Sequence, residues 1–374
     1  MPTVLHVITG LDTGGAETAL FRLIDGSATG NYQHRVVTLL PGGTMLPVFR
    51  QAGIDVIEID LRRAPLTCFL RLVRIMRTTR PDIVQTWMYH ADLVGGLAAR
   101  VAGNRNVIWG IRTTGIAHAP RATAVVRRLC AWLSGRVPHT IVCVANASRR
   151  AHVDNGYDGQ RMVVVHNGFN RSPAVGTLQR KALRAQWGFD DTHVVIGNLG
   201  RFDPDKDLQN FIRAAGLLAP LHPRLRFVMI GHRNEGERAQ LNAWVAGTRH
   251  PECFALMRER ADAPVCLAAM DVFCLSSRNE GLPVVVGEAM AAAVPCVVTD
   301  VGDTALLVGD TGVVVPREDA AALAAGLEQM LRMGPDGRRS LGLRASARVH
   351  ERFTARRTLE QFEKVYGRVM EGRN

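Results

Sequence analysis

The sequence predicts an α/β protein made of two doubly wound, Rossmann-like domains that face each other across a cleft. Its 374 residues exceed what one ordinary hydrophobic core needs and are enough for two. Short apolar runs rich in β-branched residues alternate with amphipathic helical patterns in both halves, which is typical of parallel sheets covered by helices on both faces. The alternation breaks once, in a polar stretch near the middle of the chain that contains Pro173 and Gly176.

The first half is expected to hold seven strands and the second half six. In the first half the strands are expected at 4–9, 35–40, 56–60, 83–86, 107–111, 140–144 and 162–166, with helices such as 18–25, 69–79 and 92–101 between them. In the second half they are expected at 194–199, 225–230, 253–257, 272–276, 296–299 and 312–315, with helices that include 207–218 and 283–292. We therefore place domains at 1–170 and 191–354, a linker at 171–190, and a helix within 355–374 that packs back on the first domain.

The composition is that of a cytoplasmic globular protein. Hydrophobic residues make up 47% of the chain and charged residues 21%, and the longest apolar runs fall far short of the ~20 residues that span a bilayer. The first ten residues predict a strand and not a signal peptide. The seven cysteines are scattered and form no C-x-x-C pair, so the sequence indicates neither a disulfide framework nor a zinc site.

The positive charge is concentrated in the first half. Residues 1–170 carry 19 arginines, no lysine and 10 acidic residues, whereas the whole chain has a net charge of +12. Such an excess favours an anionic partner, which leaves nucleic acid, phospholipid and a pyrophosphate-linked acceptor as alternatives. Nucleic acid is the least favoured of them, because no nucleic-acid motif is present and aromatic residues make up only 6%.

One candidate anion site follows the strand expected at 272–276. The loop carries Glu280, Pro283 suits the first position of a helix, and Glu288 follows about a turn and a half later. A helix start at the carboxyl end of a strand offers free N–H groups and a partial positive charge. Two carboxylates beside a phosphate site could accept hydrogen bonds from sugar hydroxyls; the alternative is that both are solvated surface acids.

A second candidate site lies in the loop after the strand at 194–199. Arg201 and Lys206 share this loop, and such a pair can neutralise a diphosphate and stabilise it as a leaving group. The alternative is an ordinary solvated basic pair. The run Asp203-Pro204-Asp205 spells D-x-D, but Pro204 between two acids favours a turn and a helix cap over a metal site.

The combination of these loops resembles the retaining glycosyltransferases of family 4, which carry an E-x7-E signature. The matching residues are Arg201, Lys206, the run Glu280-Gly281-Leu282-Pro283, and Glu288. Further matches are Gly14-Gly15-Ala16-Glu17, the run Thr86-Trp87-Met88-Tyr89-His90 with Asp92, Asn167-Gly168, and Thr299-Asp300 before Gly302. The resemblance extends from Val4 to about Phe353 and implies the GT-B architecture, with an acceptor-binding first domain and a nucleotide-sugar-binding second domain.

The resemblance implies a role for each matching residue of the second domain. Arg201 and Lys206 would bind the donor diphosphate, and Glu280 would contact the donor sugar. The backbone of Gly281, Leu282 and Pro283 would meet the sugar or the phosphates, and Glu288 would hold the ribose. The family commonly has a glycine where this chain has Arg258; Arg258 is therefore a further candidate donor contact, and the nucleobase is less certain than the phosphates.

The resemblance also implies roles in the first domain. Gly14 and Gly15 would let the first loop approach the donor phosphates, since glycine permits close backbone contact; the alternative is a tight turn before a helix. His90 would lie near the reacting carbon, and its alternative is a structural histidine. Glu17, His90, Asp92 and Arg112 are the candidate acceptor contacts.

Two segments suggest contact with an anionic membrane surface. Residues 69–80 and 121–136 interleave apolar residues with arginines, as helices that lie in a headgroup layer do. The alternative for each is a core-facing helix with a solvated basic face. Contact with the inner face of the cell membrane would suit an acceptor on a lipid carrier.

The function expected from the resemblance is retaining transfer of a hexose or N-acetylhexosamine from a nucleotide-diphospho-sugar, a UDP-sugar by preference. The acceptor would be a lipid-linked saccharide in bacterial surface polysaccharide synthesis, meaning lipopolysaccharide O-antigen, capsule or exopolysaccharide. No cofactor and no metal are expected, and no nucleic-acid partner. A nucleotide-sugar epimerase of the same architecture and a non-catalytic sugar-nucleotide-binding protein remain as alternatives.

Overall fold

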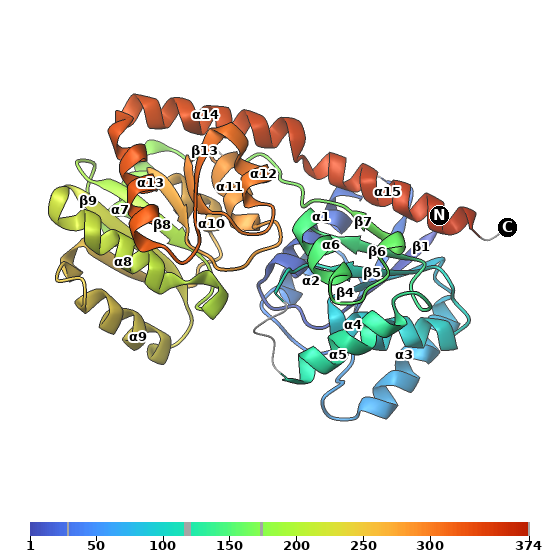
Figure 1. Ribbon diagram of the computed structural model, residues 1–374. Helices are drawn as coiled ribbons and strands as arrows, with labels where there is room; N and C mark the ends of the chain where they lie inside the picture. Colours follow the sequence, from blue (N-terminus) through green and yellow to red (C-terminus); the bar gives the residue numbers. More distant parts are fainter. Residues whose placement is uncertain (28–29, 116–120, 173–174, 373–374) are drawn as a thin grey trace. The chain divides into compact units, whose positions relative to one another are not determined.

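The computed structural model describes residues 1–27, 30–115, 121–172 and 175–372. The chain forms two compact units, one of Met1–Gly168 with Ala355–Asn374 and one of Phe169–Thr354 (Figure 1). Residues 373–374 of the C-terminal segment lie outside the described part, as does Pro173 of the predicted linker. Each unit has its own parallel sheet, so the α/β fold class predicted from the sequence is confirmed.

The sheet of the first unit has seven parallel strands in the order β3-β2-β1-β4-β5-β6-β7, the strand order of a doubly wound fold with one strand added. The strands are β1 Thr3–Ile8, β2 Gln33–Thr38, β3 Val56–Glu58, β4 Ile83–Trp87, β5 Val107–Ile111, β6 Thr140–Cys143 and β7 Met162–Val164. The helices are α1 Gly15–Gly26, α2 Leu46–Gln51, α3 Pro65–Thr79, α4 Tyr89–Val101, α5 Arg121–Leu133, α6 Asn146–Val153 and α15 Ala355–Glu371, with the 3-10 turn η1 Gly159–Arg161.

Alternating side chains of the strands feed two separate cores in the first unit. On β1, Leu5 and Val7 pack against α3, α4 and α5, whereas Val4 and Ile8 pack against α1, α2 and α15. Figure 1 shows α3, α4 and α5 on one side of this sheet and α1 and α15 on the other. The period of two along a strand thus explains why these runs are apolar throughout.

Helix α15 completes the core of the first unit. Its buried residues are Phe362, Val365, Tyr366 and Val369. The Tyr366 hydroxyl donates to the amide oxygen of Gln85 on β4, and its ring meets that of Tyr32 edge-on. The last described helix of the chain is therefore part of a core whose other members are all N-terminal.

The sheet of the second unit has six parallel strands in the order β10-β9-β8-β11-β12-β13. The strands are β8 Val194–Leu199, β9 Leu225–His232, β10 Phe254–Arg258, β11 Val272–Leu275, β12 Cys296–Thr299 and β13 Gly312–Val315. The helices are α7 Thr177–Gln186, α8 Leu208–Leu218, α9 Glu235–Ala246, α10 Ala263–Ala268, α11 Val284–Ala291, α12 Thr304–Val308, α13 Ala320–Arg332 and α14 Gly334–Arg352. The 3-10 turns are η2 Pro204–Lys206, η3 Ala219–Leu221, η4 Pro251–Cys253 and η5 Gly309–Thr311.

The segment predicted as a linker differs from that prediction. Residues 177–186 form helix α7, which belongs to the second unit. Arg180 and Arg184 each form an ion pair with Asp271 at 2.7 Å, and the Arg184 side chain is only 2% exposed. Leu183 is the one apolar side chain that α7 buries, and Leu178 is 83% exposed. A helix docked mainly by charged side chains is easily taken for an irregular polar segment, as this one was.

Candidate active site

Two loops of the second unit begin at the carboxyl ends of neighbouring strands. The loop 200–207 follows β8 and the loop 276–283 follows β11, and the two strands pair with Phe273 opposite Gly197. Because the carboxyl ends of parallel strands lie at one edge of a sheet, ligands of doubly wound folds bind at that edge. The two stretches that the sequence singled out therefore lie side by side.

A salt bridge joins the two loops at their centre. The Lys206 ammonium lies 2.6 Å from a carboxylate oxygen of Glu280, and the two side chains are 23% and 12% exposed. The Ser277 hydroxyl donates to the same oxygen at 2.7 Å. A charge pair with so little contact to water is screened much less than a surface pair, so it places a cation and an anion at fixed positions on the edge of the sheet.

Three more hydrogen bonds hold the loops together around this pair. The Ser276 hydroxyl donates to the Lys206 carbonyl at 2.9 Å. The Arg278 amide donates to the Asp205 carbonyl at 2.8 Å, and the Asn279 amide group donates to the Asp205 carboxylate at 3.1 Å. The Asp203 carboxylate accepts from the Asp205 amide and caps η2. The acids of the D-x-D run thus form the turn and cap that the sequence predicted.

Arg278 adds an ion pair across the same two loops. Its guanidinium lies 2.9 Å from a carboxylate oxygen of Asp207. The hydrogen bond to Asp207 raises the pKa of Arg278 above its ordinary value. Asp207 has a left-handed backbone with φ of 44°, a conformation that asparagine and aspartate adopt more readily than most residues.

Arg201 differs from its neighbours because it is exposed and forms no hydrogen bond or ion pair with the described part of the chain. It follows Gly200 directly in the loop after β8. An exposed guanidinium with no protein partner keeps all its donors available for an anion.

Helix α11 begins beside Glu280, with one difference from the predicted boundary. Pro283 is the residue before the helix, with φ of −68° and ψ of 117°, and the first helical residue is Val284. Gly281, Leu282 and Pro283 are buried, whereas Glu288 is half-buried in the second turn of α11. The start of α11 and the Lys206–Glu280 pair therefore belong to the same corner of the second unit.

The loop after β12 supports this corner from a third strand. The Thr299 hydroxyl donates to the Ser277 carbonyl at 2.7 Å, and the Asp303 amide donates to the Gly281 carbonyl at 2.9 Å. A Cβ atom on Gly302, whose φ is 59°, would lie 2.3 Å from the carbonyl oxygens of both Glu280 and Gly281. Only glycine allows the two backbones to approach this closely.

Arg258 is not brought to this cluster. It is the last residue of β10, after an irregularity in the strand register. Its guanidinium donates to the Arg233 carbonyl at 2.8 Å, so its hydrogen bond goes to the end of β9 and not to either loop.

In the first unit, Gly14 and Glu17 lie at the start of α1. Gly14 precedes the first helical residue, Gly15, and has extended backbone with φ of −168°. A Cβ atom on Gly14 would lie 2.5 Å from a Glu17 carboxylate oxygen. The missing side chain of Gly14 therefore makes room for the carboxylate of Glu17.

His90 lies in the first turn of α4, immediately after a strained residue. Met88 has φ of 73°, which is rare for a residue with a long side chain and is found most often at functional sites. His90 is half-buried, and its side chain forms no hydrogen bond with the described residues. Burial lowers the pKa of His90 below its ordinary value, so its imidazole is neutral at pH 7 and has both ring nitrogens available to a ligand.

Asp92 lies inside the first unit, which does not agree with its predicted contact to an acceptor. Its side chain is completely buried and accepts hydrogen bonds from the Thr86 hydroxyl at 2.5 Å and the Gly110 amide at 3.2 Å. Burial raises the pKa of Asp92 to about 8. The residue holds the ends of β4 and β5 to the start of α4, and so it positions the turn that carries His90.

Arg112 lies at the end of β5 beside Trp87. Its guanidinium is 5.3 Å from the centre of the Trp87 ring and donates to the side-chain oxygen of Asn167, which follows β7. Burial lowers the pKa of Arg112 to about 10, and the negative charge of Glu17 opposes that shift. Glu17 and Arg112, two predicted acceptor contacts, are therefore close enough to interact.

Two family models match consecutive parts of the chain. The model described as Glycosyltransferase Family 4 matches residues 13–172, and the model described as Glycosyl transferases group 1 matches residues 179–348. Together they cover most of both units. The chain is a member of the glycosyltransferases.

Curated relatives of this glycosyltransferase are bacterial enzymes. The UDP-Gal:alpha-D-GlcNAc-diphosphoundecaprenol alpha-1,3-galactosyltransferase of Escherichia coli is 26% identical over 64% of this chain, and the match spans 63% of that enzyme. The putative glycosyltransferase EpsD of Bacillus subtilis is 27% identical over 84% of this chain and 85% of its own length.

Solved glycosyltransferase structures share the fold of this chain. HepE from Anabaena, solved in complex with UDP-glucose, superposes with a TM-score of 0.87 over 98% of this chain and 99% of its own, at 19% sequence identity. A sucrose-phosphate synthase from Thermosynechococcus elongatus also superposes on this chain, with a TM-score of 0.82. The GT-B type of fold predicted from the sequence is confirmed.

The described part of this glycosyltransferase contains neither a helix that could cross a membrane nor a cluster of metal-ligating side chains. Among residues 1–27, 30–115, 121–172 and 175–372, no helix is both long and apolar enough to span a membrane. In the same ranges, no three histidine, cysteine or acidic side chains come together as metal ligands would.

Sequence reasoning missed one glycine that shapes the site. Gly231, near the end of β9, has φ of 136°, and a Cβ atom there would lie 2.0 Å from the Gly200 carbonyl oxygen. Gly231 thus lets the start of the Arg201 loop lie against β9. The available signal was a glycine near the end of an apolar run, which often marks a close backbone approach.

Replacing Gly302 with alanine is expected to weaken UDP binding by about tenfold or more, because an added Cβ must push apart the Glu280–Gly281 backbone it would meet at 2.3 Å. Calorimetric titration of UDP measures the effect. Gly334→Ala is the matched control, because Gly334 has a similar φ of 68° but open space around its Cβ position. Gly334→Ala should lower the free energy of unfolding by about 1–2 kcal/mol through backbone strain and leave the UDP affinity unchanged. Equal UDP affinities of the two variants would contradict the assignment of the Glu280–Gly281 corner to nucleotide binding.

Proposed function

We propose that this glycosyltransferase moves a hexose or N-acetylhexosamine from a UDP-sugar to a saccharide on a lipid carrier, with retention of the anomeric configuration and without a metal ion. The observation that carries the proposal is the Lys206–Glu280 pair at the junction of two cross-linked loops. Arg201, Lys206 and the start of α11 supply positive charge where a diphosphate leaving group needs it.

In this proposal the donor lies over the loops after β8 and β11. Arg201 and Lys206 bind the diphosphate, Glu280 accepts hydrogen bonds from the sugar hydroxyls, and Glu288 holds the ribose. Because Lys206 already contacts Glu280, the same ammonium can bridge the sugar-binding carboxylate and the phosphate. UDP as the nucleotide carrier of the sugar is supported by the UDP-glucose complex of HepE. The region of Arg258 contacts the nucleobase in this proposal.

The proposed acceptor site lies in the first unit, at His90, Glu17 and Arg112. In the transfer, the bond between the sugar C1 and the diphosphate oxygen breaks and a bond from C1 to the acceptor oxygen forms on the same face. The acceptor proton passes to the departing diphosphate, and His90, neutral at pH 7, orients the sugar or the acceptor hydroxyl. The lipid-carrier acceptor is supported by the E. coli relative, whose name gives a diphosphoundecaprenol substrate.

The test is transfer to a synthetic lipid-diphosphate acceptor from a panel of UDP-, GDP- and ADP-sugars in the presence of EDTA, with the product linkage read by NMR. An α-linked product from one α-linked UDP-sugar is the expected result. A β-linked product would overturn retention, and activity abolished by EDTA would overturn metal independence. Conversion of the donor without an acceptor would identify an epimerase, and nucleotide binding without any turnover would identify a binding protein.

The same proposal assigns a membrane-facing surface to the first unit. On α5 the apolar residues Val125, Leu129 and Trp132 are 55%, 44% and 67% exposed, at a spacing that places them on one helix face. The Arg136 guanidinium lies 5.5 Å from the centre of the Trp132 ring. On α3, Leu66 and Leu70 are 73% and 58% exposed. Exposed apolar residues among arginines suit an anionic headgroup layer.

Part of α3 fits the alternative of a core-facing helix with a solvated basic face. Leu72, Val73 and Met76 of α3 are buried against the sheet, so much of the apolar character of residues 69–80 does face the core. The proposed membrane contact therefore rests on the N-terminal part of α3 and on the exposed face of α5.

Replacing Trp132 and Leu129 together with glutamate is expected to weaken binding to vesicles that contain phosphatidylglycerol by at least about tenfold, because burial of two large apolar side chains is lost. Vesicle flotation measures the effect. Leu221→Glu is the control, since Leu221 is 69% exposed but lies in the second unit. Equal flotation of the two variants, or binding to neutral phosphatidylcholine alone, would count against this surface.

A further inference from the structure

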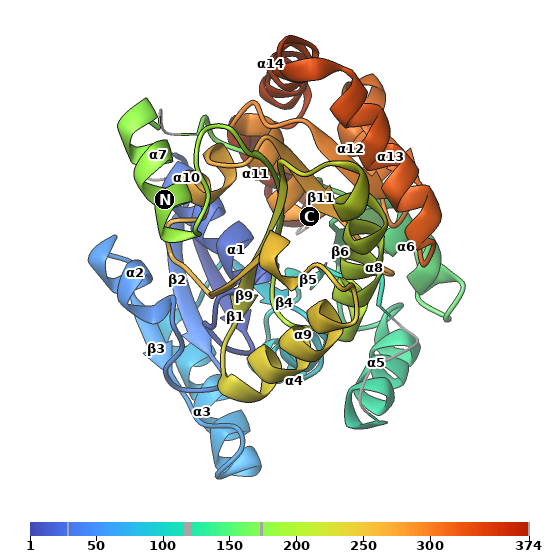
Figure 2. The ribbon, with the colours of Figure 1, turned by 90° about the vertical axis from the view of Figure 1, so that its left-hand side faces the viewer.

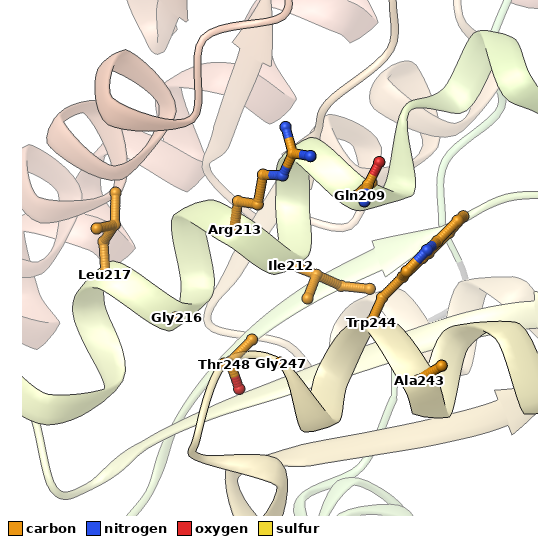
Figure 3. Close-up of a pocket in the computed structure, with 9 residues that line it drawn as sticks. All are labelled: Gln209, Ile212, Arg213, Gly216, Leu217, Ala243, Trp244, Gly247 and Thr248. Atoms are coloured by element: carbon orange, nitrogen blue, oxygen red, sulfur yellow. The ribbon is translucent and has the colours of Figure 1, made fainter.

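A groove lies between helices α8 and α9 of the second unit, and none of the residues assigned to the donor above lines it. This open groove has a volume of about 540 Å³ and is lined by Gln209, Ile212, Arg213, Gly216, Leu217, Ala243, Trp244, Gly247 and Thr248. Figure 3 shows Gln209 and Ile212 on α8 near the Trp244 indole of α9, with the Arg213 guanidinium extending from the neighbouring side of α8, and Figure 2 shows the two helices as neighbours. Ligand sites of small molecules commonly have volumes of about 300–1,000 Å³.

The polar side chains on the α8 wall have no partners among the described residues. Gln209 and the exposed Arg213 form no hydrogen bond or ion pair there. The wall residues include one cation and no carboxylate. The groove is therefore complementary to a ligand that combines a negative charge with neutral hydrogen-bonding groups.

The opposite wall presents an aromatic ring held in place. The Trp244 ring stacks on Phe202 at 5.7 Å between ring centroids, with 18° between the ring planes. An indole fixed in this way has little side-chain freedom to lose when a ligand binds. The C–H face of a pyranose ring can pack on such an apolar surface while its hydroxyls remain free for hydrogen bonds.

The end of the groove near Leu217 and Gly247 lies at the C-terminal ends of α8 and α9. The Val245 carbonyl there already accepts from the Thr248 hydroxyl at 2.7 Å and from the Thr248 amide at 3.0 Å. The negative ends of the two helix dipoles would repel an anionic group at this end. The anionic group of the ligand is therefore expected toward Arg213, and its neutral hydroxyls toward the helix ends.

We propose that the groove between α8 and α9 is a second carbohydrate site, which binds an acidic saccharide through Trp244 and Arg213. This function goes beyond the transfer reaction, since none of its residues is assigned to the donor or the acceptor. Phe202, which stacks on Trp244, follows Arg201 directly in the sequence. The loop 200–207, proposed to bind the donor diphosphate, therefore also supports the new site.

Calorimetric titration of trigalacturonate into the full-length protein, with UDP present at saturation to fill the donor site, tests the proposal. We expect one site, with an affinity that falls about tenfold in Arg213→Gln, since a charge-assisted hydrogen bond contributes about that much. A larger loss is expected in Trp244→Leu. The neutral trisaccharide maltotriose should bind more weakly than trigalacturonate. Glucose 1-phosphate should also bind more weakly, because it carries an anionic group but no saccharide chain.

Matched variants separate this site from the general attraction of a protein with a net charge of +12. Arg238→Gln removes the same charge from α9, outside the groove, and Arg112→Ala alters the proposed acceptor site. Both should bind trigalacturonate as the wild type does. Equal weakening by Arg213→Gln and Arg238→Gln, loss only in Arg112→Ala, or no saturable binding would each overturn the proposal. UDP affinity is measured in every variant, so failure of the donor assignment appears separately.

Discussion

Replacing Lys206 with alanine lowers kcat by about 10²–10³-fold in our expectation, the range found when one group that stabilises a developing charge is removed. Two effects add. The leaving diphosphate loses a cation, and Glu280, only 12% exposed, loses the ammonium that lies 2.6 Å from it. Removing one member of a largely buried ion pair is costly for the member that remains, so the Glu280 side chain would also be displaced.

Glu280→Gln separates these two effects. Glutamine keeps the shape and can still accept from the Ser277 hydroxyl, but it removes the negative charge that Lys206 faces. If the sugar contact matters, Glu280→Gln lowers kcat while UDP affinity changes little, whereas Lys206→Ala reduces both. Titration of UDP, GDP and ADP into the wild type identifies the nucleobase, since the three differ only in the base. Glu288→Ala should weaken binding of the preferred nucleotide, because the proposed ribose contact is lost.

A second lysine of the same unit provides the control. Lys181 and Asp191 form an ion pair at 2.7 Å with side chains that are 52% and 48% exposed. Lys181→Ala therefore breaks a bond of similar length in a solvated setting, where such pairs contribute little. In steady-state kinetics, the kcat of Lys181→Ala should stay close to that of the wild type. A Lys206→Ala enzyme within about threefold of wild-type kcat would remove the basis for the donor assignment.

Replacing Asp92 with asparagine should change how the stability of the first unit depends on pH. The folded protein holds the Asp92 proton up to a pKa of about 8, whereas the unfolded chain releases it near the ordinary value of about 4. Between these values the folded state binds more protons, so stability falls as pH rises. The slope is about −1.4 kcal/mol per pH unit for one group, or about 2 kcal/mol between pH 6.5 and 8.

Buried histidines impose the opposite slope at lower pH. Burial lowers the pKa values of His34 and His152 to about 4, and it lowers that of His6 as well. Between pH 4 and 6.5 the unfolded chain therefore binds more protons than the folded protein, and stability rises with pH. Three histidines outweigh one aspartate in this window, so the wild type should be most stable near pH 6.5.

Denaturant unfolding followed by tryptophan fluorescence at several pH values between 5 and 8 measures both slopes. Asp92→Asn should keep the rise below pH 6.5 and lose the decline above it, since an amide keeps the hydrogen bonds from Thr86 and Gly110 but has no proton to release. Asp25→Asn, on the exposed side of α1, should retain the wild-type profile. A decline above pH 6.5 that persists in Asp92→Asn would show that another group causes it.

The sequence predicted the sheets well because their strands are buried on both faces. In β5, every residue from Val107 to Ile111 is buried, so the apolar run and the strand have the same ends. Strand β2 was expected at 35–40 but lies at Gln33–Thr38, because its first half is only partly buried and Leu39 and Leu40 continue as an apolar bend. Apolar runs report burial, and they report strands only where the two coincide.

The contacts within the candidate site could be predicted as a group but not as pairs. The resemblance placed Arg201, Lys206 and Glu280 in one donor site, and the pairing of β8 with β11 brings their two loops together in the structure. That Lys206 and not Arg201 contacts Glu280 depends on the turn that Asp203 and Asp205 form, and one sequence does not specify that geometry.

Asp92 shows a signal that was present and not used. Asp92, Gly95, Gly96 and Ala99 recur at the spacing of one helix face, and a Cβ atom on Gly95 or Gly96 would meet Thr86 or Trp109 at 2.9 and 2.5 Å. A helix face made of such small residues packs closely on its sheet. An acid in that row must be buried, and the row could have excluded Asp92 as a surface contact.

The discontinuous first unit has a consequence for how the protein is made. Phe362, Tyr366 and Val369 of α15 belong to the core formed by residues 4–165, yet the ribosome adds them only after the whole of Phe169–Thr354. Throughout synthesis of the second unit, the nascent first unit must leave uncovered the apolar surface of α1 and β4 that α15 later covers, and such a surface is a natural binding site for a chaperone. A fragment ending at residue 168 should therefore aggregate, and adding residues 355–372 through a short glycine-serine link should restore a soluble domain.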